Sequence, residues 1–139
     1  MGAFDWLFLV GRILFSAVFI FSGLGHFLQL EEMSEYAGAK GVPAPKLMTV
    51  LSGVAILLGG LSILFWTQVI VGSWLLAGFL VVAAFTIHDF WAVDDPQQAQ
   101  VEMQQFMKNL AMAGAAVVFY VTVQAAQQGG DAVTAIFGG

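Results

Sequence analysis

The sequence predicts an all-α protein, an integral membrane four-helix bundle with a short interfacial helix in its first loop. Hydrophobic residues make up 60% of the 139 residues and charged residues only 9%, whereas a soluble domain is about 25% charged. The apolar residues fall into four runs of about 20 residues, which is the length that a helix needs to cross a bilayer core about 30 Å thick. Nearly all charged residues lie between these runs. Together these observations predict four membrane spans.

The predicted spans cover residues 6–28, 47–66, 69–88 and 106–126. Only Thr67 and Gln68 separate the second run from the third. So short a connection requires the two helices to be antiparallel neighbours. We expect residues 1–127 to form one four-span domain and residues 128–139 to form a C-terminal tail.

The first loop, residues 29–46, contains the pattern of a short amphipathic helix. Leu30, Met33, Ala37 and Lys40 are spaced so that they share one side of such a helix, which suits a helix lying in the membrane interface. Gly41 fits the left-handed position that ends a helix. The two prolines that follow predict a stiff turn into the second span.

The third loop predicts an early start for the fourth helix. Asp95 precedes Pro96, an order typical of a helix cap followed by the first helical residue. We therefore expect this helix to begin near Pro96 in water and to enter the membrane near Phe106.

Four spans place both termini at one end of the bundle, here called the terminal end, and the first and third loops at the other, here called the loop end. Lys40, Lys46 and Lys108 lie at the loop end, and Arg12 is the basic residue near the terminal end. Since basic residues favour the cytoplasmic side, we expect the termini to be extracytoplasmic.

Polar side chains gather at the loop end. They are His26, Tyr36, Lys40, His88, Asp89, Trp91, Lys108 and Asn109. Such groups can hydrogen-bond the carbonyls of a quinone or a lipid head group, and an indole can stack on a ring. The alternative is that they are ordinary interface anchors, because aromatic and basic residues are common at membrane boundaries.

Arg12 lies within the first span, roughly 9 Å below the interface at ~1.5 Å per residue. Tyr120 and Gln124 of the fourth span have a comparable depth. One expectation is an intramembrane polar contact between Arg12 and these two residues. The other is that Arg12 extends to the surface and pairs with Asp5.

Several kinds of chemistry are excluded or unsupported. The chain has no cysteine, so disulfides, iron–sulfur clusters and zinc–thiolate sites are excluded. A net charge of −5 gives no basic footprint for nucleic acid. His26, His88 and Asp89 could in principle hold a metal or haem, but they lack ligand spacing, and we assign no metal site and no catalytic residue.

Six short segments in the helices and the first loop form a recognisable series. They are Gly11-Arg-Ile-Leu14, Phe21-Ser-Gly-Leu-Gly-His26, Tyr36-Ala-Gly-Ala-Lys-Gly-Val-Pro43, Leu57-Leu-Gly-Gly-Leu61, His88-Asp-Phe-Trp91 and Lys108-Asn-Leu-Ala111. In this order they resemble the DoxX family of small four-helix membrane proteins. The chain departs from the family pattern at two places. Members often have a Glu near the position of Ile56, and many have a Lys where His26 stands.

The resemblance implies a location in a prokaryotic plasma (inner) membrane. Some relatives are subunits of a thiosulfate:quinone oxidoreductase, which implies an accessory subunit of a quinone-linked oxidoreductase system. Quinone is then the expected cofactor, and the expected partners are the lipid bilayer, further copies of the chain, or other membrane or peripheral redox subunits. The alternative is a non-catalytic scaffold or assembly subunit of a larger membrane complex. With no redox motif of its own, the chain leaves open whether it is an enzyme.

Overall fold

The computed structural model describes residues 2–129, and within that range it contains helices and no strand. The elements are α1 (Ala3–Leu28), α2 (Leu30–Ala39), α3 (Pro45–Phe65), α4 (Val69–Thr86), the 3-10 helix η1 (Phe90–Ala92) and α5 (Pro96–Gln127). Of the helices in this range, α1, α3, α4 and α5 are long and apolar enough to cross a membrane. The all-α class with four membrane helices is therefore confirmed.

The ends of the helices follow the local chemistry that the sequence predicts. The Asp95 carboxylate accepts a hydrogen bond from the backbone N–H of Gln98 at 3.0 Å and caps α5. Gly41 has φ +83° just after α2, the left-handed conformation that glycine tolerates best. The predicted tail, residues 128–139, lies outside the described residues except for its first two.

The α3–α4 hairpin is as tight as predicted. Trp66 and Gln68 both have left-handed backbones, with φ of 54° and 50°. Between them, the Thr67 carbonyl accepts a hydrogen bond from the Ser62 hydroxyl at 2.6 Å. This bond ties the turn to the last turns of α3 and helps to offset the unfavourable backbone conformations.

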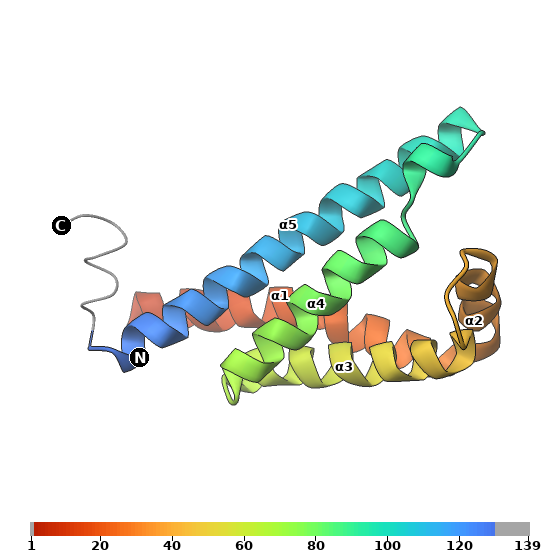
Figure 1. The fold of residues 1–139 in the computed structure, drawn as a ribbon. Helices are drawn as coiled ribbons and strands as arrows, with labels where there is room; N and C mark the ends of the chain where they lie inside the picture. The colour runs from red at the N-terminus through yellow and green to blue at the C-terminus, as the bar shows by residue number, and fades with distance from the viewer. Residues whose placement is uncertain (1, 130–139) are drawn as a thin grey trace.

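The long helices form two pairs that are joined by this hairpin. Helix α1 packs along α3, α4 packs along α5, and α3 contacts α4. Glycines allow the close approaches: a Cβ on Gly59 would lie 2.6 Å from Leu76, and one on Gly53 would lie 2.8 Å from the Cβ of His26. In Figure 1 the two pairs lie close together near the termini and spread apart toward α2 and η1.

Aromatic side chains close the terminal end. Phe119 of α5 meets Phe15 of α1 and Trp66, with ring centroids 4.8 and 6.0 Å apart. Phe8 in turn meets Trp66 at 4.6 Å. We call these four residues the aromatic plug, because they fill the space between α1 and α5 where the pairs converge.

The loop end is hollow. Helix α2 lies across this end of the α1–α3 pair (Figure 1). Between the pairs lies a cavity of about 1420 Å³ whose lining comes from α1 through α5. The candidate functional site is built around this cavity.

Candidate functional site

The cavity combines an apolar interior with a polar mouth. It is larger than the roughly 300–1,000 Å³ of a typical small-molecule pocket. Its walls within the spans include Val18, Phe19, Ala55, Leu75 and Phe79, and its rim at the loop end includes Tyr36, Lys40, His88 and Asp89. Such a division suits an amphipathic ligand with a polar head and an apolar tail.

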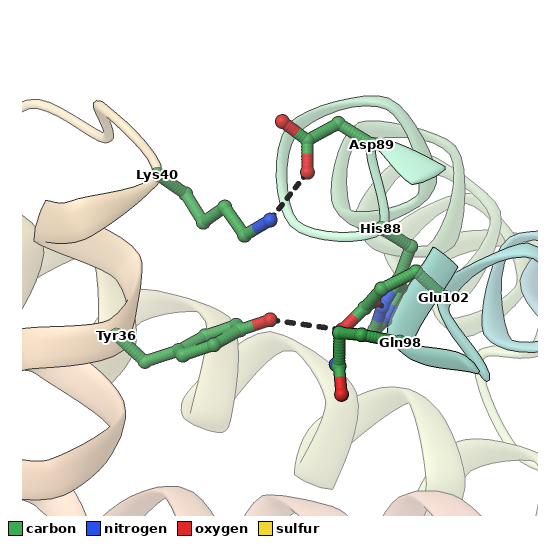
Figure 2. Close-up of polar contacts among 6 residues, drawn as sticks. All are labelled: Tyr36, Lys40, His88, Asp89, Gln98 and Glu102. Carbon is green, nitrogen blue, oxygen red and sulfur yellow. Dashed lines mark hydrogen bonds and ion pairs between the residues drawn. The ribbon is translucent and has the colours of Figure 1, made fainter. Parts of the chain in front are cut away.

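Six polar residues form a network across the mouth, which we call the clasp. Tyr36 lies in α2 and Lys40 is its C-cap, His88 and Asp89 lie in the connection after α4, and Gln98 and Glu102 lie in α5. Figure 2 shows Lys40 reaching Asp89 in an ion pair, and Tyr36 pointing toward Glu102 from the same side. The clasp thus joins α2 to the α4–α5 pair over the hollow end of the bundle.

Glu102 is the centre of the clasp. It is 5% exposed, and Tyr36 Oη and Gln98 Nε2 both donate to its Oε1, each at 3.0 Å. His88 Nδ1 lies 2.7 Å from its Oε2. Because an ionised carboxylate only accepts hydrogen bonds, His88 carries a proton at Nδ1 when Glu102 is ionised.

Sequence reasoning missed two clasp residues, Gln98 and the central Glu102. Both lie in the part of the fourth helix that we expected to be in water. A signal was nevertheless present: Glu102, Asn109, Ala113 and Ala116 are spaced by seven, four and three residues, which places them on one helix face. All four are buried, so the small residues of the span predict the face on which Glu102 lies.

The network shifts the pKa values of the two α2 residues. The hydrogen bond to Asp89 raises the pKa of the Lys40 ammonium. Desolvation by burial, followed by the hydrogen bond to Glu102, raises the pKa of the Tyr36 hydroxyl. At neutral pH, therefore, Lys40 is a cation and Tyr36 is a hydrogen-bond donor.

The residues expected at the loop end separate into three groups. Tyr36, Lys40, His88 and Asp89 join the clasp. Trp91 and Lys108 line the cavity but are exposed, and the Trp91 ring packs against Phe106 at 5.8 Å. His26 and Asn109 line the same cavity and are each only 6% exposed.

His26 and Asn109 differ from the clasp residues because neither side chain hydrogen-bonds another polar side chain of the described residues. His26 Nδ1 lies 2.8 Å from the Ser22 carbonyl oxygen, one turn earlier in α1, and its ring meets Phe79 edge-on at 5.9 Å. Within residues 2–129, no hydrogen bond engages the second ring nitrogen or the Asn109 side chain, and neither group is sealed from the cavity.

Arg12 has different neighbours from those that we expected. Its guanidinium carbon lies 4.9 Å from the Phe8 ring centroid and 6.0 Å from that of Trp66, so its charge faces the aromatic plug. Tyr120 and Gln124 hydrogen-bond each other at 3.2 Å. Asp5 accepts from the backbone N–H of Gly2 instead. Among the described residues, Arg12 forms no hydrogen bond or ion pair with any of these three.

The described part of the chain holds no group of three His, Asp or Glu side chains placed to bind a metal ion. His26 and His88 each direct Nδ1 at an oxygen atom of the protein. The polar atoms of the site are therefore arranged for hydrogen bonding.

The chain is similar to known proteins in two comparisons. A family model described as DoxX matches residues 7–89, a range that includes His26, Tyr36, Lys40, His88 and Asp89 but ends before Glu102. The chain is 34% identical over 117 residues to the Inner membrane protein YqjF of Escherichia coli (strain K12), and the match covers 82% of each chain. No solved structure matches this chain.

Proposed function

This chain belongs to the DoxX family, and from that premise we propose that it is an accessory membrane subunit of a quinone-linked oxidoreductase system. The chain is a multi-pass prokaryotic membrane protein with four apolar helices. The observation that supports the proposal most is the cavity of about 1420 Å³, which is apolar within the spans and polar at the loop end. Its size and its division match a ring-shaped head group carrying a long apolar tail.

The residues around the cavity fit a quinone. The ring carbonyls accept hydrogen bonds, which Asn109 and Lys108 can donate. The Trp91 indole at the rim offers a face for stacking, and the apolar walls offer a path for the tail. When bound, the quinone supplies two-electron redox chemistry, and the chain supplies position and protons.

The clasp is suited to hold a proton near the head group. The His88 side chain is 21% exposed and its Nδ1 contacts the buried Glu102. One group thus contacts both solvent and the interior. We propose that His88, or its neighbour Asp89, exchanges with water the proton that accompanies quinone reduction.

Electrons must come from another subunit. The chain has no cysteine and no motif for a flavin or haem that we recognise, so it offers no redox centre of its own. A peripheral or membrane-bound redox subunit, together with further copies of this chain, would complete the system. Under this proposal the protein binds and positions quinone while its partner delivers electrons.

Quinone binding to purified protein tests the proposal. We expect the full chain in lipid nanodiscs to bind decylubiquinone and to quench tryptophan fluorescence through Trp91 or Trp74, both of which line the cavity. His88→Ala should weaken this binding, whereas Gln124→Leu, at the terminal end, should not. The proposal fails if wild-type protein does not bind quinone, and an unchanged quinone affinity in His88→Ala excludes the role given to His88.

A scaffold role is the second candidate, and one observation favours it. Gly114 lies on an exposed face of α5, and a Cβ built there would have no atom within 4 Å. Another membrane helix can approach such a surface closely. Under this reading Gly114→Leu would abolish co-purification with a larger complex and leave the fold and the quinone assay unchanged.

We also propose that the loop end faces the cytoplasm, because Lys40, Lys46 and Lys108 lie there. The absence of cysteine makes the test direct. Glu35→Cys and Gln128→Cys place single thiols at exposed positions of opposite ends. In intact cells a membrane-impermeant maleimide should label the Gln128→Cys variant alone, and the reverse pattern would invert the topology.

A further inference from the structure

The clasp and the inner cavity offer different hydrogen-bonding capacity to a ligand. In the clasp, Glu102 satisfies Tyr36, Gln98 and His88, and Lys40 satisfies Asp89. These groups are already engaged with one another. Deeper in the cavity, His26 and Asn109 are almost completely buried yet keep polar atoms without a protein partner. A ligand head group would gain most by reaching these two residues.

The partner of His26 fixes the role of its free nitrogen. A backbone carbonyl oxygen can only accept, so His26 Nδ1 must donate to Ser22. In the neutral imidazole, Nε2 then bears a lone pair and accepts. No described carboxylate forms an ion pair with His26, and its ring packs on Phe79. The inner cavity therefore presents an acceptor at this point.

Asn109 is less selective. Its amide nitrogen donates and its amide oxygen accepts, and a carboxamide can turn to present either atom. It can therefore hydrogen-bond either the carbonyl or the hydroxyl of a ring. The asymmetry of the site comes from His26.

Resting on the proposed quinone-linked function, we infer that the inner cavity at His26 and Asn109 binds the reduced, dihydroxy form of a quinone more tightly than the oxidised, diketone form. A ring hydroxyl donates to His26 Nε2. A ring ketone facing the same nitrogen brings two acceptors together, and no hydrogen bond forms between them. The preference belongs to His26, while Asn109 adds affinity for both forms.

The expected preference is about tenfold or more, since it reflects one buried hydrogen bond made or left unmade. Tighter binding of the reduced form makes the bound pair easier to reduce. A tenfold preference corresponds to a rise of about 30 mV in the midpoint potential of a two-electron couple. The site would then favour reduction of the bound quinone and slow the release of the quinol.

A phospholipid phosphate fits the inner position less well. An anionic oxygen requires donors, and His26 Nε2 offers a lone pair. At the rim, the Lys40 ammonium is already paired with Asp89. The inner position therefore favours an uncharged ring that bears hydroxyl groups.

The test compares two probes on the full chain in lipid nanodiscs. Decylubiquinol and decylubiquinone are titrated by tryptophan quenching, the reduced form under anaerobic conditions. Wild-type protein should bind the quinol about tenfold more tightly. His26→Phe keeps an aromatic ring against Phe79 but removes the acceptor, so it should bind both forms with nearly equal affinity. Asn109→Leu should weaken both forms to a similar extent and keep the preference.

The outcomes separate this inference from the proposed function. Equal affinity of wild-type protein for the two probes, or an unchanged preference in His26→Phe, overturns the inference and leaves quinone binding intact. Binding of neither probe overturns both. If His26→Phe does not fold, His26→Gln restores an acceptor on a flexible amide and should show a reduced preference, and an undiminished preference there would also refute the role of His26.

Discussion

The two ends of the bundle differ in how the space between the two helix pairs is occupied. At the terminal end, Phe8, Phe15, Trp66 and Phe119 fill the gap between α1 and α5. At the loop end, the helix pairs spread apart and the clasp joins α2 to α4 and α5 across a cavity. Large aromatic rings fill the gap between the helices, whereas the hydrogen-bonded side chains of the clasp connect elements across a gap that stays open. The gap is therefore filled by apolar packing at the terminal end and spanned by polar bonds at the loop end.

The largest expected effect comes from the feature that both ends share, the α3–α4 contact. Gly59→Leu places a side chain where even a Cβ would lie 2.6 Å from Leu76. Forcing these helices apart should lower the free energy of unfolding by roughly 3 kcal/mol and disrupt both ends together. Unfolding in detergent followed by circular dichroism measures this. Gly114→Ala, at a position with open space, is the matched control and should leave the free energy of unfolding almost unchanged.

The second prediction breaks the loop end alone. Glu102→Leu leaves His88, Tyr36 and Gln98 without their acceptor and should cost about 2 kcal/mol. Hydrogen exchange in α2 should rise, while exchange near the aromatic plug stays as in wild type. Glu102→Gln retains an acceptor oxygen, so its rate of hydrogen exchange in α2 should lie between those of wild type and Glu102→Leu. Equal exchange in all three proteins would show that the clasp does not hold α2.

The third prediction breaks the terminal end alone. Phe119→Ala removes two aromatic pairs, with Phe15 and with Trp66, and should cost between about 1 and 2 kcal/mol. The quinone assay at the loop end should be unaffected. Val118→Ala, on the exposed side of the same turn, serves as control. A loss of ligand binding in Phe119→Ala would show that the two ends are coupled.

The smallest expected effect comes from the ion pair of the clasp, between Lys40 and Asp89. The pair is partly exposed and should contribute at most about 1 kcal/mol. Because the folded protein raises the Lys40 pKa, this contribution is full below the unfolded value of about 10.4 and is lost as the pH rises through the folded value. As the pH rises through the pKa of Lys40 in the folded protein, hydrogen exchange in α2, corrected for its intrinsic pH dependence, should accelerate in wild type but not in Lys40→Met.

Much of the fold could be predicted because its signals are local. The four apolar runs, the Asp95 cap, the left-handed Gly41 and the two-residue connection at Thr67 and Gln68 each depend on a few neighbouring residues. The gathering of Tyr36, Lys40, His88 and Asp89 followed from topology alone. These features need no knowledge of how helices pack.

The rest depends on pairs of distant residues. The spread of the helices depends on how Gly59 meets Leu76 and on how Phe119 meets Phe15, and one sequence does not specify those pairs. The expected partners of Arg12 were chosen by depth, which does not tell which way a side chain turns. Glu102 required combining its helical spacing with the burial of Ala113 and Ala116, which only the assembled bundle makes evident.

The clasp also has a consequence for how the protein is made. Tyr36 and Glu102 are separated by 66 residues, and Lys40 and Asp89 by 49. At a synthesis rate of about 5–20 residues per second, several seconds pass between the synthesis of Tyr36 and Lys40 and the synthesis of their partners. The α1–α3 pair can form during that interval, while α2 has nothing to bind across the gap. The clasp therefore forms only after the chain has been made through Glu102, and a nascent chain arrested before Glu102 should insert into the membrane without it.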